Sequence, residues 1–249
     1  MEESQKMKIV ATVEARMGSS RLPGKVLLPA GGVPLLGHLI SRLRKVELID
    51  EIVLATTSEP GDDILEKWAN QHQILCFRGS SSDVMGRVLQ AAKSVQGEII
   101  VEITGDCPII DPDIVELAIQ TFLANSAEYV SNALVRSYPV GMDVQVFHLE
   151  TLERSYGQTS DALDYEHVTR HIRRNPDEFK LLNLIAPERL RWPELGLTLD
   201  EIGDYKLIKY LVEHFEGSSN FSCGDIIILL RERPQLLEMN DSVTRKGMG

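Results

Sequence analysis

The first half of the chain alternates between short apolar runs and longer stretches in which apolar residues recur at helical spacing. The apolar runs predict strands over residues 8–13, 51–57, 74–77 and 98–103. The amphipathic stretches predict helices over residues 34–46, 62–72, 82–95 and 111–123. This alternation predicts an α/β fold, with a Rossmann-like, mostly parallel sheet and helices on both of its faces.

The second half breaks this rhythm. Residues 142–147 alternate between apolar and polar positions, which predicts an antiparallel strand or hairpin, and residues 180–185 form a further candidate strand. Helical patterns cover residues 165–174, 203–215 and 224–233. The 249 residues contain no linker of domain-separating length. We therefore expect one domain over residues 1–238, with a small antiparallel excursion at about 136–190, and a flexible tail over residues 239–249.

Composition and charge narrow the classes of function. The net charge of −11 does not suit the basic surface that broad nucleic-acid binding needs, so no nucleic-acid partner is expected. Three cysteines lie far apart and form no paired motif, which favours a reducing compartment. Residues 1–8 are polar and charged, unlike a signal peptide, and no apolar run reaches the ~20 residues of a membrane-spanning helix. The sequence thus predicts a cytoplasmic protein without membrane insertion.

A loop rich in glycine and basic residues follows the first predicted strand. It reads Arg16-Met-Gly-Ser-Ser-Arg-Leu-Pro-Gly-Lys25 and contains three cationic side chains. Gly18 would let the backbone approach a phosphate closely, and Pro23-Gly24 predicts a turn that aims Lys25 back at the loop. Ligands in open α/β folds bind at the carboxyl ends of parallel strands, which is where this loop lies.

Two familiar phosphate-binding motifs do not fit this loop. A Walker A loop needs glycine where Ser19 stands, and serine or threonine where Val26 stands. The dinucleotide pattern GxGxxG fails at Ser20. From the residues alone, a solvated basic turn remains an alternative to an anion-binding site.

Several ordered motifs resemble the cytidylyltransferase family, whose members activate sugars such as 3-deoxy-manno-octulosonate and acylneuraminate with CTP. The motifs are Glu14-Ala-Arg-Met-Gly-Ser-Ser-Arg-Leu-Pro-Gly-Lys25, Ala55-Thr-Thr-Ser-Glu-Pro60, Phe77-Arg-Gly-Ser80, Thr104-Gly-Asp-Cys-Pro-Ile-Ile-Asp111 and Glu166-His-Val-Thr169. The resemblance spans residues 8–238 and is strongest to the spore-coat polysaccharide biosynthesis protein F branch. It implies a fold of the nucleotide-diphospho-sugar transferase type, CTP and a small anionic acceptor as partners, and a homodimer. Related sequences usually carry glutamine where Glu14 stands.

Two aspartates are candidate ligands of Mg²⁺. Asp106 follows the fourth predicted strand, and a carboxylate beside a triphosphate is repelled unless a divalent cation lies between them. The resemblance implies that Asp106 binds this cation and that Asp200, in Leu197-Thr-Leu-Asp200, is the second ligand. Asp106 could instead cap its turn, and Asp200 could cap the helix that follows. Asp204 is the substitute if the register differs.

The resemblance also implies roles for other side chains. Arg16, Lys25 and Asp106 would be catalytic. The nucleotide would contact Ala15, Gly18, Ser19, Arg21, Thr56, Arg78, Asp83 and Thr104. The acceptor would contact Asp143, Glu166 and His167, although His167 could equally be a packing residue. Arg87 could pair with Asp83 on one helix face.

The resulting hypothesis is a magnesium-dependent transfer of CMP from CTP to a sugar acid or related anionic acceptor, with release of pyrophosphate, in the synthesis of surface polysaccharide precursors. Three alternatives stay open: a phosphonate cytidylyltransferase, a nucleotide-sugar-dependent glycosyltransferase and a non-catalytic nucleotide-binding relative. Asp111-Pro-Asp113 has the form of a glycosyltransferase metal cluster, but Pro112 indicates a helix start.

Overall fold

One seven-stranded sheet forms the centre of the structure, a computed structural model that describes residues 6–215 and 220–243. Its strand order is β5-β4-β1-β6-β8-β7-β9. The strands are β1 (Ile9–Glu14), β4 (Glu51–Thr57), β5 (Leu75–Gly79), β6 (Ile99–Thr104), β7 (Tyr129–Ser131), β8 (Gln145–His148) and β9 (Leu181–Asn183). All neighbours are parallel except β8, which is antiparallel to both β6 and β7. A separate two-stranded antiparallel hairpin joins β2 (Pro29–Ala30) to β3 (Val33–Pro34).

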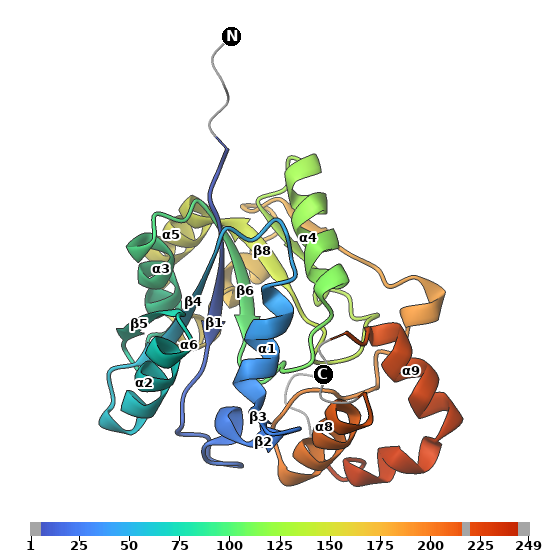
Figure 1. Ribbon diagram of the computed structural model, residues 1–249. Helices are drawn as coiled ribbons and strands as arrows, with labels where there is room; N and C mark the ends of the chain where they lie inside the picture. The colour runs from blue at the N-terminus through green and yellow to red at the C-terminus, as the bar shows by residue number, and fades with distance from the viewer. Residues whose placement is uncertain (1–5, 216–219, 244–249) are drawn as a thin grey trace.

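Helices cover both faces of this sheet (Figure 1). They are α1 (Leu35–Leu43), α2 (Asp63–Gln71), α3 (Val84–Ser94), α4 (Pro112–Ala124), α5 (Leu149–Gln158), α6 (Ala162–Glu166), α7 (Arg170–Arg174), α8 (Ile202–His214) and α9 (Cys223–Glu232). One apolar cluster joins α1, α2, α4, α8 and α9 to the first face, and a second joins α3, α5 and α7 to the other. The predicted α/β class, with its mostly parallel sheet and its antiparallel excursion, is confirmed. Within the described residues, no helix has the length and apolar character to cross a membrane.

The central strands are continuously apolar because helices bury both of their faces. Five of the six residues of β1, and five of the six of β6, are buried. A strand that is covered on both sides gains from apolar residues at every position, whereas a strand with one wet face alternates. This is why apolar runs, rather than alternation, marked these strands in the sequence.

The second half departs from the predicted elements in two places. The helix expected over residues 165–174 is two short helices, α6 and α7, because the chain turns between them and Thr169 points inward to donate to Gln145 Oε1. The short strand β7 and the helix α5, which begins directly after β8, were not predicted.

The packed part of the chain continues beyond residue 238, the expected limit of the domain. Asn240 is buried, and its amide donates to the carbonyl of Gly196 and to Asp204 Oδ1, both at 3.0 Å. Val243 is buried as well. Residues 244–249 of the expected tail lie outside the described residues.

Candidate active site

A cavity of about 770 Å³ opens at the carboxyl ends of β1 and β6. Its walls come from the loop after β1, the turn after β6, the start of α3 and the end of α6. Near this end of the sheet, α8 packs against the β2–β3 hairpin (Figure 1). We call this space the first cavity. It occupies the position at which open α/β folds bind their ligands.

The predicted turn at Gly24 directs Lys25 into the first cavity. Gly24 has a φ of 70°, a left-handed conformation that glycine adopts without steric cost. Its N–H donates to the carbonyl of Met17 at 2.9 Å, which folds the loop back on itself. Gly18 lies outside the lining of the cavity, and a Cβ there would meet nothing within 4 Å. The close approach of a phosphate to the backbone of Gly18 stays a prediction.

Lys25 lies between the two aspartates that were predicted as metal ligands. Its Nζ is 3.4 Å from Asp106 Oδ2 and 3.1 Å from Asp200 Oδ1. Arg21 adds a second cation, with Nη2 2.8 Å from Asp200 Oδ1. The Lys25 side chain is only 14% exposed, so these charges interact with less screening than they would in open water.

Backbone contacts hold the two aspartates at one place. The N–H of Gly105 donates to the carbonyl of Glu14 at 2.8 Å, and a Cβ at Gly105 would approach that oxygen to 2.5 Å. Glycine is therefore required where the turn after β6 crosses the end of β1. The N–H of Leu199 donates to the carbonyl of Asp106 at 2.8 Å, which places Asp200 beside the turn.

The side chains near Asp200 show that Asp200 does not cap α8, which was the alternative to its role as a metal ligand. Helix α8 is capped by Glu201, and Asp204 completes the capping box. Asp204 Oδ2 accepts from the N–H groups of Asp200 and Glu201, both at 3.1 Å. Because Asp204 performs this role, the Asp200 carboxylate faces the cavity. Asp106 accepts from the hydroxyl of Thr104 at 2.6 Å.

The pair Asp106 and Asp200 fits a magnesium ion bound together with a phosphorylated ligand. The ammonium of Lys25 takes the place of such a cation here, because it lies at a point where both carboxylates stabilise a positive charge. No group of three or more acidic, histidine or cysteine side chains suited to a metal exists among the described residues. Mg²⁺ commonly takes one or two carboxylates and completes its shell with phosphate oxygens and water.

Other predicted nucleotide contacts divide into two groups. Ala15, Ser19, Arg21 and Thr104 line the first cavity with Arg16, whose exposed side chain forms no ion pair with any described residue. Thr56, Arg78 and Asp83 lie outside the lining.

Each of these three outlying residues has a structural explanation. Thr56 is fully buried within β4. Arg78 pairs with Asp63 and Glu66 at 2.7 and 3.0 Å, so its guanidinium holds α2 against β5. Asp83 caps α3 by accepting from the N–H of Gly86 at 2.7 Å, and it also accepts from the hydroxyl of Tyr156. Arg87 does not form the ion pair with Asp83 that its spacing suggested, and instead donates to the carbonyl of Ser80.

Glu14, at the edge of the loop, has a carboxyl group whose surroundings favour its neutral form. Its Oε1 is buried, and burial together with the neighbouring Glu102 raises the pKa of Glu14 well above the usual range. Burial also raises the pKa of Glu102, to about 7. A protonated Glu14 carries no charge, so it can lie close to a polyphosphate without repelling it.

A second cavity, of about 480 Å³, adjoins the first, and Thr104 lines both. Asp143 lies on its wall and forms a two-point contact with Arg136, at 2.7 and 3.0 Å. Glu102, Gln145 and Arg173 also line it. The expected acceptor residues are thus divided, because Glu166 and His167 line the first cavity. Sequence reasoning missed Arg136 and Glu102, since only the tertiary structure brings their segments together.

The candidate glycosyltransferase cluster does not form a metal site. Asp111 caps α4, and its Oδ1 accepts from the N–H of Asp113 at 3.0 Å. Its Oδ2 accepts from the N–H of Cys223 at 2.6 Å. One oxygen of Asp111 therefore caps the start of α4, as Pro112 indicated, and the other binds the first residue of α9.

Comparison with known proteins gives a consistent result. Residues 10–214 match a protein-family model described as cytidylyltransferase. The spore coat polysaccharide biosynthesis protein SpsF of Bacillus subtilis is 34% identical over 231 residues, which cover 91% of this chain and 95% of that protein.

Two solved structures extend the comparison. A cytidylyltransferase from Leptospira borgpetersenii superposes with a TM-score of 0.90 at 34% identity, covering 96% of this chain and all of that one. CMP:2-keto-3-deoxy-manno-octonic acid synthetase complexed with CTP superposes with a TM-score of 0.65 at 17% identity, covering 84% of this chain and 99% of that one. The second likeness shows a shared fold.

Proposed function

The chain belongs to the cytidylyltransferase family and is a CTP-dependent nucleotidyltransferase, and from this premise we propose that it transfers CMP to a sugar acid or a related anionic acceptor, releasing pyrophosphate. One observation carries the proposal. Lys25 and Arg21 meet Asp106 and Asp200 in a cavity that also contains the unpaired cation Arg16. This arrangement suits a triphosphate that is bound together with a divalent cation.

The basic loop would bind the triphosphate. Arg16 has no protein partner to give up among the described residues, so its guanidinium is free for phosphate oxygens. Lys25 and Arg21 would exchange their aspartate contacts for phosphate contacts when CTP enters. Donors that are already placed where negative charge grows stabilise the departing pyrophosphate more than the bound substrate, and this difference accelerates the reaction.

Asp106 and Asp200 would hold Mg²⁺, which when bound neutralises phosphate charge and makes the α-phosphorus more susceptible to attack. Thr104 supports this role, because its hydroxyl fixes the orientation of the Asp106 carboxylate at 2.6 Å. The hydrogen bond from Leu199 to Asp106 would keep the two ligands together while Lys25 moves toward the phosphates.

The second cavity would bind the acceptor next to the α-phosphate. Arg173 lines it without an ion pair to any described residue, so it can bind an anionic group. Asp143 would act by holding the guanidinium of Arg136. Glu166 and His167, at the end of α6, would contact the acceptor from the first cavity. Thr104, which lies in both walls, marks the place where the two substrates meet.

The proposal includes the setting of the reaction. The relative from Bacillus subtilis is named for spore coat polysaccharide biosynthesis, which supports a role in surface polysaccharide precursors. We propose a cytoplasmic homodimer, and exposed apolar side chains of the second half are candidates for its interface: Val135, Leu163 and Ile185. Sedimentation at several concentrations checks this assembly, and a monomer throughout would contradict it.

A matrix of nucleotides and acceptors tests the proposal. CTP, UTP, ATP and GTP would each be incubated with 3-deoxy-manno-octulosonate, N-acetylneuraminate and 2-aminoethylphosphonate, with Mg²⁺ present. We expect a CMP adduct of a sugar acid, with pyrophosphate formed in equal amount. An adduct of the phosphonate alone would favour the phosphonate cytidylyltransferase instead. CTP binding without any adduct would favour a non-catalytic relative.

A further inference from the structure

Two carboxyl groups meet at the boundary between the two cavities. Glu14 ends β1 and lines the first cavity, whereas Glu102 lies in β6 and lines the second. The register pairs Thr12 with Glu102 and Glu14 with Thr104, so both glutamates project from the same face of the sheet. The two carboxyl groups lie close enough for each to affect the pKa of the other.

Gln145 fixes the position of Glu102 from the opposite side. Its Oε1 accepts from the hydroxyls of Tyr129 and Thr169, both at 2.5 Å. The amide oxygen is therefore saturated, and the amide of Gln145 acts on Glu102 as a donor that lowers the pKa of its carboxyl group. Since β8 is antiparallel to β6 with Gln145 opposite Glu102, the sheet register builds this contact.

The charges around the pair favour one shared proton. Two adjacent carboxyl groups cannot both ionise without strong repulsion, and burial adds to this cost. On the Glu14 side, Arg87 of α3 favours ionisation, whereas Asp106 opposes it. On the Glu102 side, Arg173 of α7 favours ionisation, and the hydroxyl of Tyr129 in β7 lies nearby. The pKa of Glu14 lies well above its usual range and that of Glu102 is raised to about 7, so Glu102 can gain or lose a proton near neutral pH.

The other carboxylates near the second cavity are already engaged. Asp143 is held by Arg136, and Asp106 is held by Lys25. Glu194 lies at the exposed rim. Glu102 forms no ion pair with a described residue, and its buried Oε2 has no hydrogen-bond partner among them. Glu102 lines the second cavity, and a buried carboxyl group with an unpartnered oxygen is suited to accept a proton from a bound acceptor.

We propose that Glu102 accepts the proton of the acceptor hydroxyl during the transfer, an inference that rests on the proposed function. The acceptor oxygen forms a bond to the α-phosphorus of CTP. The bond from that phosphorus to the bridging oxygen breaks, and pyrophosphate leaves with the electron pair. The hydroxyl proton passes to the carboxylate of Glu102 and then to water. Glu14 and Gln145 are positioning residues that hold the Glu102 carboxylate.

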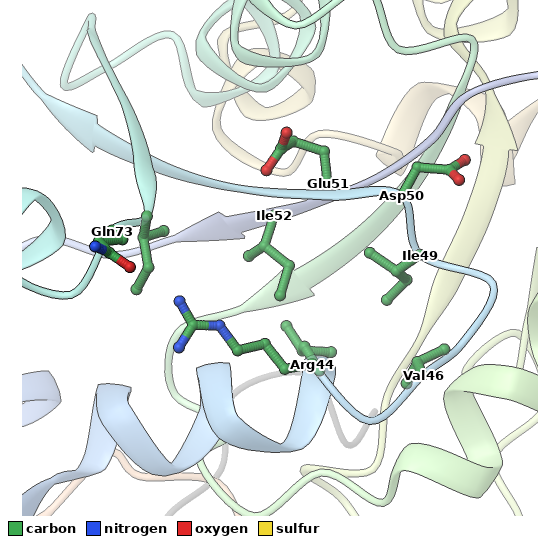
Figure 2. A pocket seen from close by; sticks show the side chains of 9 residues that line it. Arg44, Val46, Ile49, Asp50, Glu51, Ile52 and Gln73 are labelled. Atoms are coloured by element: carbon green, nitrogen blue, oxygen red, sulfur yellow. The ribbon is translucent and has the colours of Figure 1, made fainter.

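The test compares Glu102→Gln with a matched control, Glu51→Gln. Glu51 begins β4, at the amino end of the strand and therefore at the opposite end of the sheet from the site. It lines a hollow of about 220 Å³, shown in Figure 2 with Asp50 and Arg44. Both variants exchange one carboxyl group for an amide of the same shape. The probes are CTP, Mg²⁺ and whichever sugar acid, 3-deoxy-manno-octulosonate or N-acetylneuraminate, the wild type converts.

We expect Glu102→Gln to lower kcat by ~100-fold or more, a typical loss for a general base, while CTP binding stays at the wild-type level. Glu51→Gln should match the wild type. The wild-type kcat should rise with pH to a plateau above about 7, because the base must be unprotonated, and this rise should be absent in Glu102→Gln. Glu102→Asp, which keeps a carboxylate, should recover part of the rate.

One result would overturn the inference and keep the proposed function: a Glu102→Gln enzyme whose kcat and pH profile equal those of the wild type. Turnover with the phosphonate alone would overturn the inference, since an ionised phosphonate oxygen has no proton to lose, and it would replace the sugar acid of the proposed function by a phosphonate. A wild-type enzyme that forms no adduct with any probe would instead reject the proposed function, and the inference with it.

Discussion

At the residue scale, Lys25 determines the electrostatics of the first cavity. Its ammonium neutralises two carboxylates, at 3.4 and 3.1 Å, which would otherwise repel each other and any incoming triphosphate. The same side chain can later contact the phosphates. One lysine thus neutralises both aspartates, and the proposed function gives it a second role as a donor of positive charge to the phosphates.

Lys25→Met is predicted to lower kcat/KM by ~10²–10³-fold, the usual loss when a charged donor to the transition state is removed. Lys67→Met is the matched control, because Lys67 lies exposed on α2, away from the cavity. Steady-state kinetics with CTP as the varied substrate measures both. Equal kinetics in the two variants would exclude Lys25 from the mechanism.

Glu14 is predicted to make the free energy of unfolding depend on pH. Its pKa in the folded protein lies well above its usual value of 4.5, chiefly through burial. The folded state therefore holds a proton that the unfolded state releases, so this carboxyl lowers stability as pH rises above about 4.5. Glu14→Gln removes this titration and should be more stable than the wild type at pH ~8, with the difference vanishing near pH ~4.

Thermal unfolding of both proteins across this pH range measures the effect. A Tm difference that does not change with pH would mean that Glu14 is ionised in the folded protein. Glutamine also keeps a donor for Glu102, so the variant isolates the charge from the shape of the side chain.

At the scale of elements, the crossing of β1 and the turn after β6 sets the geometry of the site. The hydrogen bond from Gly105 to Glu14 joins the two segments, and there is no room for a side chain at the contact. The carbonyl of Asp106 then binds Leu199, which brings in the start of α8. Three distant segments are thus joined through one turn.

Gly105→Ala is predicted to destabilise the protein by about 1–3 kcal/mol, the usual cost of forcing atoms into a filled space. Gly157→Ala in α5 is the control, since a Cβ there meets nothing within 4 Å and alanine favours helix by ~1 kcal/mol. Denaturant unfolding compares the two. A stable Gly105→Ala protein would show that the turn can shift without loss.

The sequence predicted the elements of the first half closely because the spacing of apolar residues and the length of each segment indicate the same type of element there. The strand over residues 51–57 has the observed bounds, and the other first-half strands and helices differ by only a few residues. In the second half, β7 has three residues and α5 follows β8 without a loop, so neither has a pattern long enough to recognise. The expected single helix was broken by the contact between Thr169 and Gln145, which depends on tertiary structure.

The residues of the candidate site fall into the same two groups: those that a local motif predicted and those whose positions depend on tertiary structure. Asp106, Asp200 and Lys25 were found because each belongs to a local motif, and the structure brings them together. Arg136 and Glu102 belong to no motif, and their positions follow from the strand order. Arg78 was assigned to the nucleotide, but acidic side chains on the neighbouring helix hold it.

At the scale of the whole molecule, the net charge of −11 contrasts with the local cluster of cations in the first cavity. A polyanionic substrate is attracted only where the basic loop overcomes this background. We therefore expect the binding of CTP to depend on local donors and on a divalent cation, and salt should weaken it.

Removal of divalent cations is predicted to abolish turnover. With only Asp106 and Asp200 to hold it, the ion depends on phosphate for its remaining ligands, so a chelator should strip it readily. Activity should return when excess Mg²⁺ is added. Full turnover in the presence of the chelator would refute a metal role for the two aspartates.

The central claim is that an acceptor oxygen attacks the α-phosphorus of CTP. It is tested most directly by mass spectrometry of a reaction with CTP that carries ¹⁸O in the bridge between the α- and β-phosphorus. The account predicts a CMP adduct of the acceptor without the label, and pyrophosphate that contains all of it. An adduct that retains the label, or labelled CTP consumed without an adduct, would contradict it.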